Sequence, residues 1–577
     1  IDLSYNSFHG NLPSEWGKMS ILNELGLGNN DLSGTLPSEW KNLKQIKEIS
    51  IPENYLTGSL PSEWVALNRT LGQLNIWSNS MNFDLESASW LTSMKALTSI
   101  DFGNNPLKPG KIPSWPRKVE KLMYLSLDNT SRIGTLIPEI FDVSQLITLK
   151  LGDNALTGTI PSAIGKSTNL KQLVLSYNNF TGAFPKEIGA LPLQLLLAQN
   201  NQLTDKQALQ TLSNISTLTV LDLSKNAISG TIPGDIFSKL RDIEVFAIGS
   251  NCFTGSLPDN ICNAVNLETL ALTGMTSGQT CRDRIWEKTL LSSIFDGYLA
   301  KSLSGTLPQC IFQLPKLQTL HIGGLGLGGT ISNNITQSLI DLSAPFNALD
   351  GTLPPQLATN EKLSIIDLSH NRFTGNLNVF AHSNGKQTIN TSINYLSGSI
   401  PQKLWRTDSI NILQGNVFKC GANSKIPMND PQASSYSCGS DSYQFGLYFY
   451  IAGLCITAVV AYVINSDSKV KSEFRLWLRL ARAESELRAE GDHDTKVRSI
   501  LQFNHHLHNM RWVSLKIALV YFAVLVVYLA LSGESSRLLE HCYLWTTTAA
   551  YMTGNTATIC LLVTGFMLNC SIIYIMR

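Results

Sequence analysis

The histidines of the stretch HHLH, His505, His506 and His508, are spaced closely enough to suggest a metal site. They lie just before a long apolar segment, so we interpret them instead as a solvated cluster or one that faces lipid headgroups. Residues 1–418 contain no nucleophile elbow, no phosphate-binding GxxxxGK[ST] loop and no metal-spaced set of Cys or His. The sequence therefore predicts no enzymatic activity, no cofactor and no bound metal.

Glycosylation of sequons and disulfide formation by cysteines both depend on the cellular compartment of the chain. An Asn-X-Ser/Thr sequon accepts a glycan only in the secretory lumen, and an even number of cysteines in an exported domain favours disulfides. Cys252, Cys262, Cys281 and Cys310 allow three pairings, between which the sequence does not decide. The sequons are at Asn68, Asn129, Asn179, Asn214, Asn334 and Asn390.

The stretch LPSEW recurs at residues 12–16, 36–40 and 60–64, with a period of 24 residues. The wider pattern LxxLxLxxNxLxG continues to Asn416 at intervals of 22–25 residues or about twice that, which indicates about 17 repeats and a terminal half-repeat. Each LxL segment alternates like a strand with one buried face. The pattern predicts a leucine-rich repeat solenoid, an α/β fold with a parallel sheet on the concave face and short helices or 3₁₀ turns on the convex face.

The tryptophans of LPSEW fall at a fixed place in the repeat. Pro followed by an acidic residue suits the start of a short helix, and the residue three after the Pro should point into the core. That residue is Trp16, Trp40 or Trp64 in these copies and Ile or Leu in later ones. We expect the tryptophans to stack in the core from coil to coil; the alternative is an exposed aromatic ladder that binds a ligand.

The GxIP and GxLP wording of the repeat resembles the plant-type leucine-rich repeat. LPSEW is especially similar to surface antigens and related membrane proteins of kinetoplastid protists. The resemblance covers residues 1 to about 438 and implies a role at the cell surface without specifying a ligand. The stretch from Cys420 to Cys438 resembles the family's C-terminal cap, which implies a disulfide between them; free thiols or a metal site are the alternatives. Repeats would then occupy 1–418, and a cap with a juxtamembrane linker 419–444.

Three apolar segments follow the repeats. Residues 445–464 contain no charge, 513–532 contain only Lys516, and 544–576 again contain none. Each is long enough to cross a bilayer core as a helix, so the sequence predicts a multi-pass membrane protein.

The charged loops predict the topology of these segments. The loop 465–512 carries nine Lys and Arg, whereas 533–543 carries only Arg537. By the positive-inside rule the long loop is cytoplasmic and the repeats are extracellular, at the plasma membrane. Part of the long loop, KVKSEFRLWLRLARAESELRAEG, can form an amphipathic helix suited to membrane lipid. Because the chain begins inside a repeat, we interpret it as a fragment or processed form.

The exposed positions beside each LxL should form the concave platform, where neighbouring coils lie about 5 Å apart. In repeats four to nine these positions hold aromatic, apolar and basic residues, whereas elsewhere they are mostly small or polar. We expect them to bind an anionic or aromatic-bearing partner; the alternative is scattered exposed residues with no partner. The expected binding residues are Trp77, Tyr124, Lys150, Lys171, Val174, Tyr177, Leu195 and Leu197.

Two classes of function agree with these observations. We favour a cell-surface recognition or adhesion protein whose repeat domain binds an extracellular protein, peptide or glycan. The alternative is a multi-pass transporter, channel or membrane enzyme that carries a repeat ectodomain. A net charge of +1 gives no indication of nucleic-acid binding.

Overall fold

The computed structural model describes residues 1–274, 305–382, 385–407, 409–419 and 426–436. These residues belong to one compact unit, Ile1–Gly439. The predicted membrane segments, the loop 465–512, the HHLH histidines, Cys420 and Cys438 lie outside the described residues. In the part of the chain that is described, no helix combines the length and the apolar character needed to cross a bilayer.

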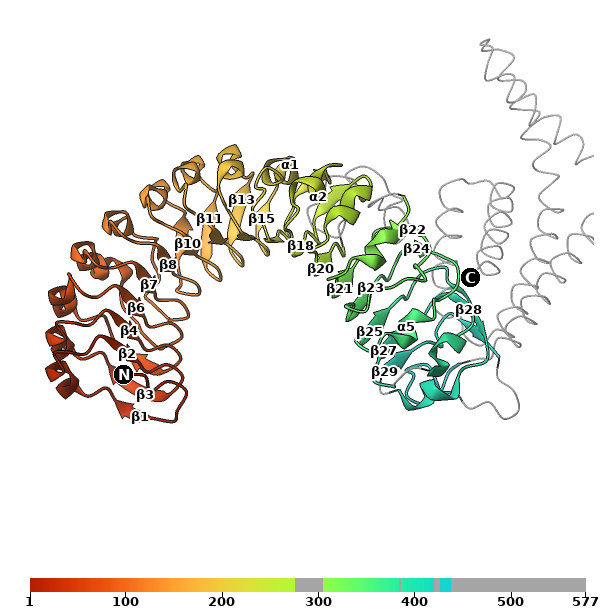
Figure 1. Cartoon of the computed structure of the whole chain (residues 1–577), viewed down its shortest axis with the longest axis horizontal. Coiled ribbons are helices and arrows are strands. Elements are labelled where there is room, and N and C mark those ends of the chain that lie inside the picture. Colours follow the sequence, from red (N-terminus) through yellow and green to blue (C-terminus); the bar gives the residue numbers. More distant parts are fainter. Residues whose placement is uncertain (275–304, 383–384, 408, 420–425, 437–577) are drawn as a thin grey trace, which may run out of the picture. The chain divides into compact units, whose positions relative to one another are not determined.

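A parallel sheet of 16 strands lines the concave side of the repeat domain (Figure 1). Each coil contributes one three-residue strand, whose middle residue is buried, so the LxL alternation predicts the strands correctly. In spatial order the strands are β2 (Glu24–Gly26), β4 (Glu48–Ser50), β6 (Gln73–Asn75), β7 (Ser99–Asp101), β8 (Tyr124–Ser126), β10 (Thr148–Lys150), β12 (Gln172–Val174), β14 (Leu195–Leu197), β16 (Val220–Asp222), β18 (Val245–Ala247), β20 (Thr269–Ala271), β21 (Thr319–His321), β23 (Asp341–Ser343), β25 (Ile365–Asp367), β27 (Thr388–Asn390) and β29 (Ser409–Asn411).

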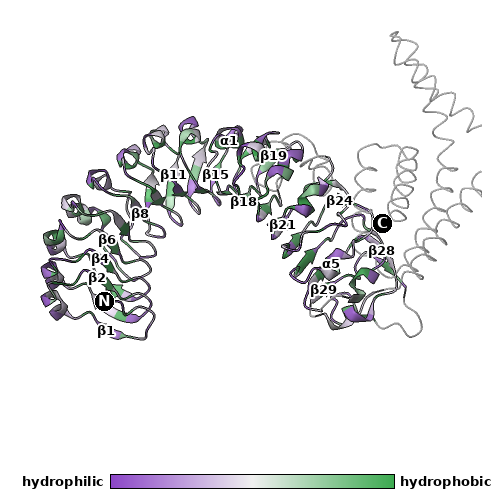
Figure 2. Ribbon diagram, in the orientation of Figure 1, coloured by the Kyte–Doolittle hydropathy of each residue, from purple (hydrophilic) through white to green (hydrophobic). Residues whose placement is uncertain are grey.

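Short helical turns, mostly 3₁₀, form the convex side. Figure 2 shows hydrophilic residues on these outer turns, whereas hydrophobic residues gather within the coils. The turns are η1 (Ser14–Lys18), η2 (Ser38–Asn42), η3 (Ser62–Leu67), η4 (Leu85–Ser93), η5 (Trp115–Lys118), η6 (Pro138–Asp142), η7 (Ser162–Lys166), η8 (Lys186–Ala190), α1 (Ala208–Leu212), α2 (Ile236–Lys239), η9 (Asp259–Asn263), η10 (Gln309–Gln313), α5 (Gln356–Thr359), η11 (Asn378–His382) and η12 (Gln402–Arg406).

Smaller parallel sheets follow the asparagine turns. They come from the NxLxG part of the repeat, where each chain segment pairs with the same segment of a neighbouring coil. The strands are β1 (His9–Asn11), β3 (Asp31–Thr35) and β5 (Tyr55–Thr57); β9 (Ile133–Thr135), β11 (Ala155–Gly158), β13 (Asn179–Gly182) and β15 (Gln202–Leu203); β17 (Ser229–Thr231) and β19 (Cys252–Thr254); β22 (Gly328–Gly329) and β24 (Ala348–Leu349); and β26 (Thr374–Gly375), β28 (Tyr395–Gly398) and β30 (Val417–Phe418).

The tryptophans of LPSEW stack through the core of the first coils. Trp40 and Trp64 are fully buried, with ring centroids 6.0 Å apart and planes inclined by 10°. Trp16 is half-buried at the end of this stack, 6.3 Å from Trp40. Each buried indole also donates a hydrogen bond to the preceding coil, from Trp40 Nε1 to Pro13 O and from Trp64 Nε1 to Pro37 O. The core interpretation is confirmed.

A column of asparagines joins successive coils through backbone hydrogen bonds. Asn178 Nδ2 donates to the carbonyls of Leu151, Leu175 and Ser176 at 2.9–3.2 Å, and its Oδ1 accepts from Leu156 N. One amide therefore satisfies four buried backbone groups of two coils. The column includes three asparagines in coils whose repeat pattern is degenerate: Asn79, Asn105 and Asn201.

The coil of β8 departs from this column. Thr130 takes the asparagine position, and the buried Arg132 donates hydrogen bonds from its guanidinium to the carbonyls of Thr130 and Lys108. The long side chain thus supplies donors that the short Thr side chain lacks.

Between β20 and β21 the chain leaves the regular repeat. Thr269 pairs directly with Thr319, although 50 residues separate them. The sequence pattern frays near residues 275–301, which predicts a loop or an altered coil there, and the direct pairing of β20 with β21 agrees with that prediction. The degenerate repeat that the count of about 17 repeats includes in this interval adds no strand to the large sheet. The helical turns on either side are bridged by a disulfide between Cys262 and Cys310. The sequence allows three pairings of the four cysteines, and this bond agrees with only one of them, in which Cys252 pairs with Cys281. Cys281 lies outside the described residues.

The last coil is closed by two polar side chains. The buried Asp430 accepts hydrogen bonds from Ile412 N and Leu413 N at 2.7 and 3.1 Å. The Tyr436 hydroxyl donates to Asn416 O and accepts from Phe418 N. Residues 426–436 thus satisfy backbone groups that an open solenoid end would leave unpaired.

Candidate functional site

The strands of the large sheet present two columns of side chains on the concave side. In each strand the middle residue, such as Leu173 or Leu196, is buried, whereas the first and third residues point away from the core. Strand register aligns these residues from coil to coil, as in the pairs Gln172 with Leu195 and Val174 with Leu197. We call them the outward columns.

Five of the eight expected binding residues lie in the outward columns. Tyr124 is on β8, Lys150 on β10, Val174 on β12, and Leu195 and Leu197 are both on β14. These strands are consecutive in the sheet, so the structure places the five on one continuous surface.

The other three expected residues lie at the margins of that surface. Lys171 directly precedes β12 and is exposed, and Trp77 follows β6 by two residues and is half-buried. Tyr177 follows β12 by three residues, is 50% exposed and has a φ of 52°. The aromatic side chains therefore border the strands and do not belong to the outward columns.

A set of apolar side chains extends beyond the expected residues. Leu195 pairs with Val220 and Val220 with Val245 along the first outward column, while Val174 pairs with Leu197 along the third-residue column. All five are half-buried, and we call them the apolar patch. Val220 and Val245 were missed by the sequence analysis, although extending the alternating pattern through VLD and VFA would have found them.

Tyr124 connects the expected residues to an acidic neighbour. Its hydroxyl donates a hydrogen bond of 2.8 Å to Asp101 Oδ2 on β7. Burial and the Asp101 carboxylate raise the pKa of Tyr124, so the hydroxyl remains a donor at neutral pH. Lys150 Nζ lies 5.4 Å from the centroid of the Tyr124 ring, a cation–π distance. The ammonium of Lys150 is therefore already held by its neighbours.

Asp128 lies beside this group and is largely buried. Its carboxylate accepts a hydrogen bond from Gly152 N of the next coil. Burial raises the pKa of Asp128 to about 6, with Asp101 and Asp153 adding to the rise while the Gly152 hydrogen bond and Lys150 oppose it. We call Asp101, Asp128 and Asp153 the acidic end of the surface.

Most charged side chains in the outward columns are acidic. The columns contain six carboxylates and a single lysine, Lys150, across the 16 strands. Carboxylates therefore outnumber ammonium groups in these columns, while Lys171 lies just outside them. The carboxylates are Glu24, Glu48, Asp101, Asp222, Asp341 and Asp367.

The sequon asparagines are accessible to different degrees. Asn68 and Asn390 are half-buried, and Asn390 is the third residue of strand β27. A glycan on Asn390 would therefore stand on the concave sheet itself, away from the apolar patch. The exposed sequon residues are Asn129, Asn179, Asn214 and Asn334.

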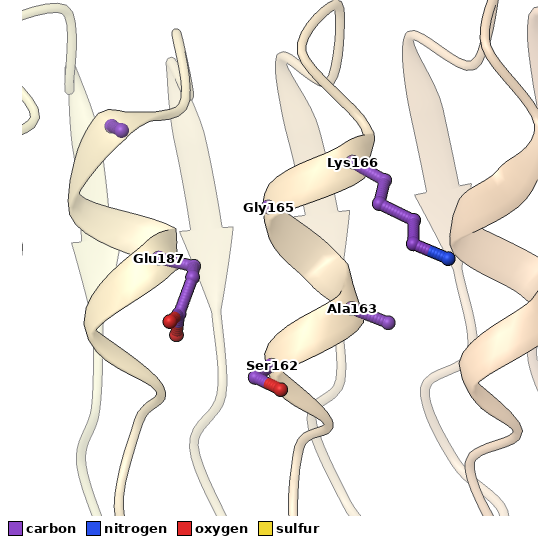
Figure 3. Close-up of a pocket in the computed structure, with 6 residues that line it drawn as sticks. Ser162, Ala163, Gly165, Lys166 and Glu187 are labelled. Atoms are coloured by element: carbon purple, nitrogen blue, oxygen red, sulfur yellow. The ribbon is translucent and has the colours of Figure 1, made fainter.

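A shallow depression of about 500 Å³ lies on the convex side between η7 and η8 (Figure 3). It is lined by Ser162, Ala163, Gly165, Lys166, Glu187 and Ala190. The Lys166 ammonium is paired with Asp142 at 2.7 Å, away from Glu187. The depression thus lacks convergent polar groups that would fix a ligand.

No group of three or more His, Cys, Asp or Glu side chains among the described residues could hold a metal ion.

Comparison with known proteins agrees with the repeat structure. Leucine-rich repeat family models match residues 120–180 and 217–238. The chain is 28% identical to Receptor-like protein 35 of Arabidopsis thaliana over 256 residues, which are 39% of this chain and 25% of that protein. It is also 28% identical to Receptor-like protein 18 of the same plant over 158 residues, which are 27% of this chain and 16% of that protein. The chain thus spans a quarter or less of these relatives, and the kinetoplastid resemblance is not shown by these matches.

Solved structures with the same fold include receptors. The plant peptide hormone receptor RGFR1, in complex with RGF2, superposes with a TM-score of 0.56 at 24% identity over 74% of this chain and 73% of that one. A TDR receptor superposes with a TM-score of 0.51 at 25% identity over 74% of this chain and 76% of that one. The described chain therefore has a leucine-rich repeat solenoid fold and is similar in sequence to receptor-like proteins of Arabidopsis thaliana.

Proposed function

We propose that this protein acts in extracellular recognition and binds a peptide or protein partner on the concave sheet. The observation that carries the proposal is the apolar patch, which stands half-exposed in a sheet face that is otherwise mostly polar. Contiguous apolar side chains on a rigid surface are what the core of a protein interface uses.

The rigidity of the sheet supports this proposal. Each strand is hydrogen-bonded to its neighbours, and the asparagines of the column join their turns to the preceding coil. The patch is therefore presented in a fixed arrangement, and a partner does not have to order it on binding. RGFR1, whose structure was solved with the peptide RGF2, has the same fold.

The membrane segments predicted from the sequence complete the proposal. The runs 445–464, 513–532 and 544–576 would anchor the protein at the plasma membrane with the repeats outside and the loop 465–512 against cytoplasmic lipid. Glycans on the sequons would follow from that orientation, and a glycan on the partner is a further candidate ligand. Because three such segments exceed what a simple anchor needs, a transporter, channel or membrane enzyme with a repeat ectodomain is the second candidate.

The test is a binding screen of the full chain against extracellular peptides, proteins and glycans, repeated with Leu197→Asp. An ionised carboxylate in the centre of the apolar patch should weaken a partner that covers it at least tenfold. The matched control is Ser343→Asp, which adds the same charge at the third residue of strand β23, in the same outward column. The two variants should have the same midpoint of denaturant unfolding, so that a difference in binding does not reflect a difference in stability.

Equal binding by both variants would show that the partner binds outside the apolar patch. Failure to find any partner would favour the second candidate, which predicts transport or catalysis across the membrane instead.

A further inference from the structure

The concave surface combines the apolar patch with the acidic end, and Val174 on β12 lies three strands along the sheet from Asp101 on β7. From this combination we infer the chemistry of the partner: an extended peptide segment with a Lys or Arg side chain at the acidic end and an apolar side chain on the patch. This inference rests on the proposed function, since it specifies what the same surface binds.

The acidic end has more negative than positive charge. Asp101 and Asp128 accept hydrogen bonds from Tyr124 and Gly152 N, and Asp153 is exposed. The nearby cation is Lys150, which lies over the Tyr124 ring. One ammonium against three carboxylates leaves a negative potential that a second cation would reduce.

Aromatic groups at this end suit a guanidinium in particular. Tyr124 lies in the outward column, and Trp77 lies close enough to Gly103 that a Cβ there would meet its ring at 2.9 Å, beside Asp101. A planar guanidinium can stack on an aromatic face while it donates hydrogen bonds to a carboxylate. We therefore expect Arg to bind more tightly than Lys.

The strand order gives the spacing between the two contacts. From Asp101 on β7 there are three strand intervals to Val174 on β12 and five to Val220 on β16, which correspond to about 14 and 24 Å at a strand spacing of about 4.8 Å. An extended chain advances about 3.3 Å per residue. The basic and apolar side chains of the partner should therefore be about four to seven residues apart.

The carboxylates elsewhere in the outward columns act in the same direction. Six carboxylates, of which Asp341 lies 2.9 Å from His321 Nε2, stand against one lysine in these columns, while the whole chain has a net charge of +1. Such a surface concentrates cationic segments by long-range attraction, and this attraction weakens as salt is added.

The experiment uses synthetic ten-residue peptides in which an Arg, Lys, Glu or Ala is placed two to eight residues from a Leu. Binding to the purified full chain is measured at low and at physiological salt. Peptides with Arg or Lys four to seven residues from Leu should bind at least tenfold more tightly than the matched Glu peptides, and less tightly as salt rises.

The variant Asp101→Asn with Asp128→Asn should remove most of this preference, because Asn keeps the shape and the acceptor oxygen but removes the charge. The control is Asp367→Asn. Asp367 occupies the same strand position on β25 and accepts from Ser369 N as Asp101 accepts from Gly103 N.

The outcomes separate this inference from the proposed function. Binding that depends on Leu197 and shows no preference for basic residues, or a preference for Glu peptides, would overturn the charge assignment and keep the recognition surface. An equal effect of Asp367→Asn and the double variant would also overturn it. Binding of none of the peptides would overturn both.

Discussion

Replacing Trp40 with Ala should loosen the N-terminal coils and leave the rest of the solenoid intact. The side chain is fully buried, stacks on Trp16 and Trp64, and donates a hydrogen bond of 3.0 Å to Pro13 O. Truncation of a buried aromatic to Ala typically destabilises by about 3–5 kcal/mol, because contacts are lost and a cavity remains. In a solenoid each coil contacts only its neighbours, so this loss should be local.

Hydrogen–deuterium exchange of the full chain measures this locality. A loss of about 3–5 kcal/mol corresponds to amide exchange that is about 100- to 5,000-fold faster where exchange requires opening of the affected coils. We expect this over residues 10–70 and unchanged exchange in the strands β14–β18. Trp16→Ala is the control, since Trp16 is half-buried with one stacking partner, and its effect should be smaller. Exchange within about threefold of the parent in the Trp40 variant would refute the core interpretation.

Three further predictions concern charge, the disulfide and the cap. Because the pKa of Asp128 is raised to about 6, the unfolded chain holds its proton less tightly, and the free energy of unfolding should fall by up to about 3 kcal/mol between pH 4 and pH 7. The free energy of unfolding from urea denaturation should fall with pH in the parent and fall less in Asp128→Asn. The same dependence on pH in both proteins would contradict the burial argument. Cys262→Ser should cost roughly 4 kcal/mol by chain entropy, since the bridge to Cys310 spans 48 residues; non-reducing peptide mapping should find the bond in the parent, and its absence there would disprove the pairing. Asp430→Asn replaces a carboxylate that accepts from two backbone amides and should lower the stability of the last coil by about 1–3 kcal/mol. Hydrogen exchange of residues 395–418 checks this, with equal protection in both proteins as the contrary result.

The repeat pattern predicted the backbone well because one arrangement recurs in coil after coil. Each described LxL segment from Glu24 to Asn411 is a strand of one sheet. The regular spacing of these strands is interrupted only between Ala271 and Thr319. There the count of about 17 repeats includes a degenerate copy, whereas the fraying of the pattern at residues 275–301 predicts a loop or an altered coil, and the strands on either side pair directly. A repeat count alone cannot distinguish a further coil from a segment that leaves the sheet.

The charge of the candidate surface was harder to predict. Lys150 and Lys171 stood out in the sequence as exposed cations, but the significance of Lys150 depends on Tyr124 and Asp128 of the preceding coil and on Asp101 of the coil before that. Residues about 25 positions apart become neighbours only through the register of the solenoid. The same reason explains why the pairing of Cys262 with Cys310 could not be chosen from the sequence.

In the turn that follows each strand, the backbone conformation is constant while one exposed side chain varies. The residue before the column asparagine has a positive φ in coil after coil, whether it is Asn29, Asp153 or the bulky Tyr177 and Phe346. This conformation disfavours L-residues by roughly 1–2 kcal/mol, and the hydrogen bonds of the adjacent asparagine offset that strain by holding the turn. Because the backbone is imposed by the asparagine, the side chain before it is free to vary. Tyr177 and Phe346, which are 50% and 59% exposed, therefore contribute chemistry to the concave margin without being required by the fold, and their positions are where partner-specific contacts can change while the solenoid stays the same.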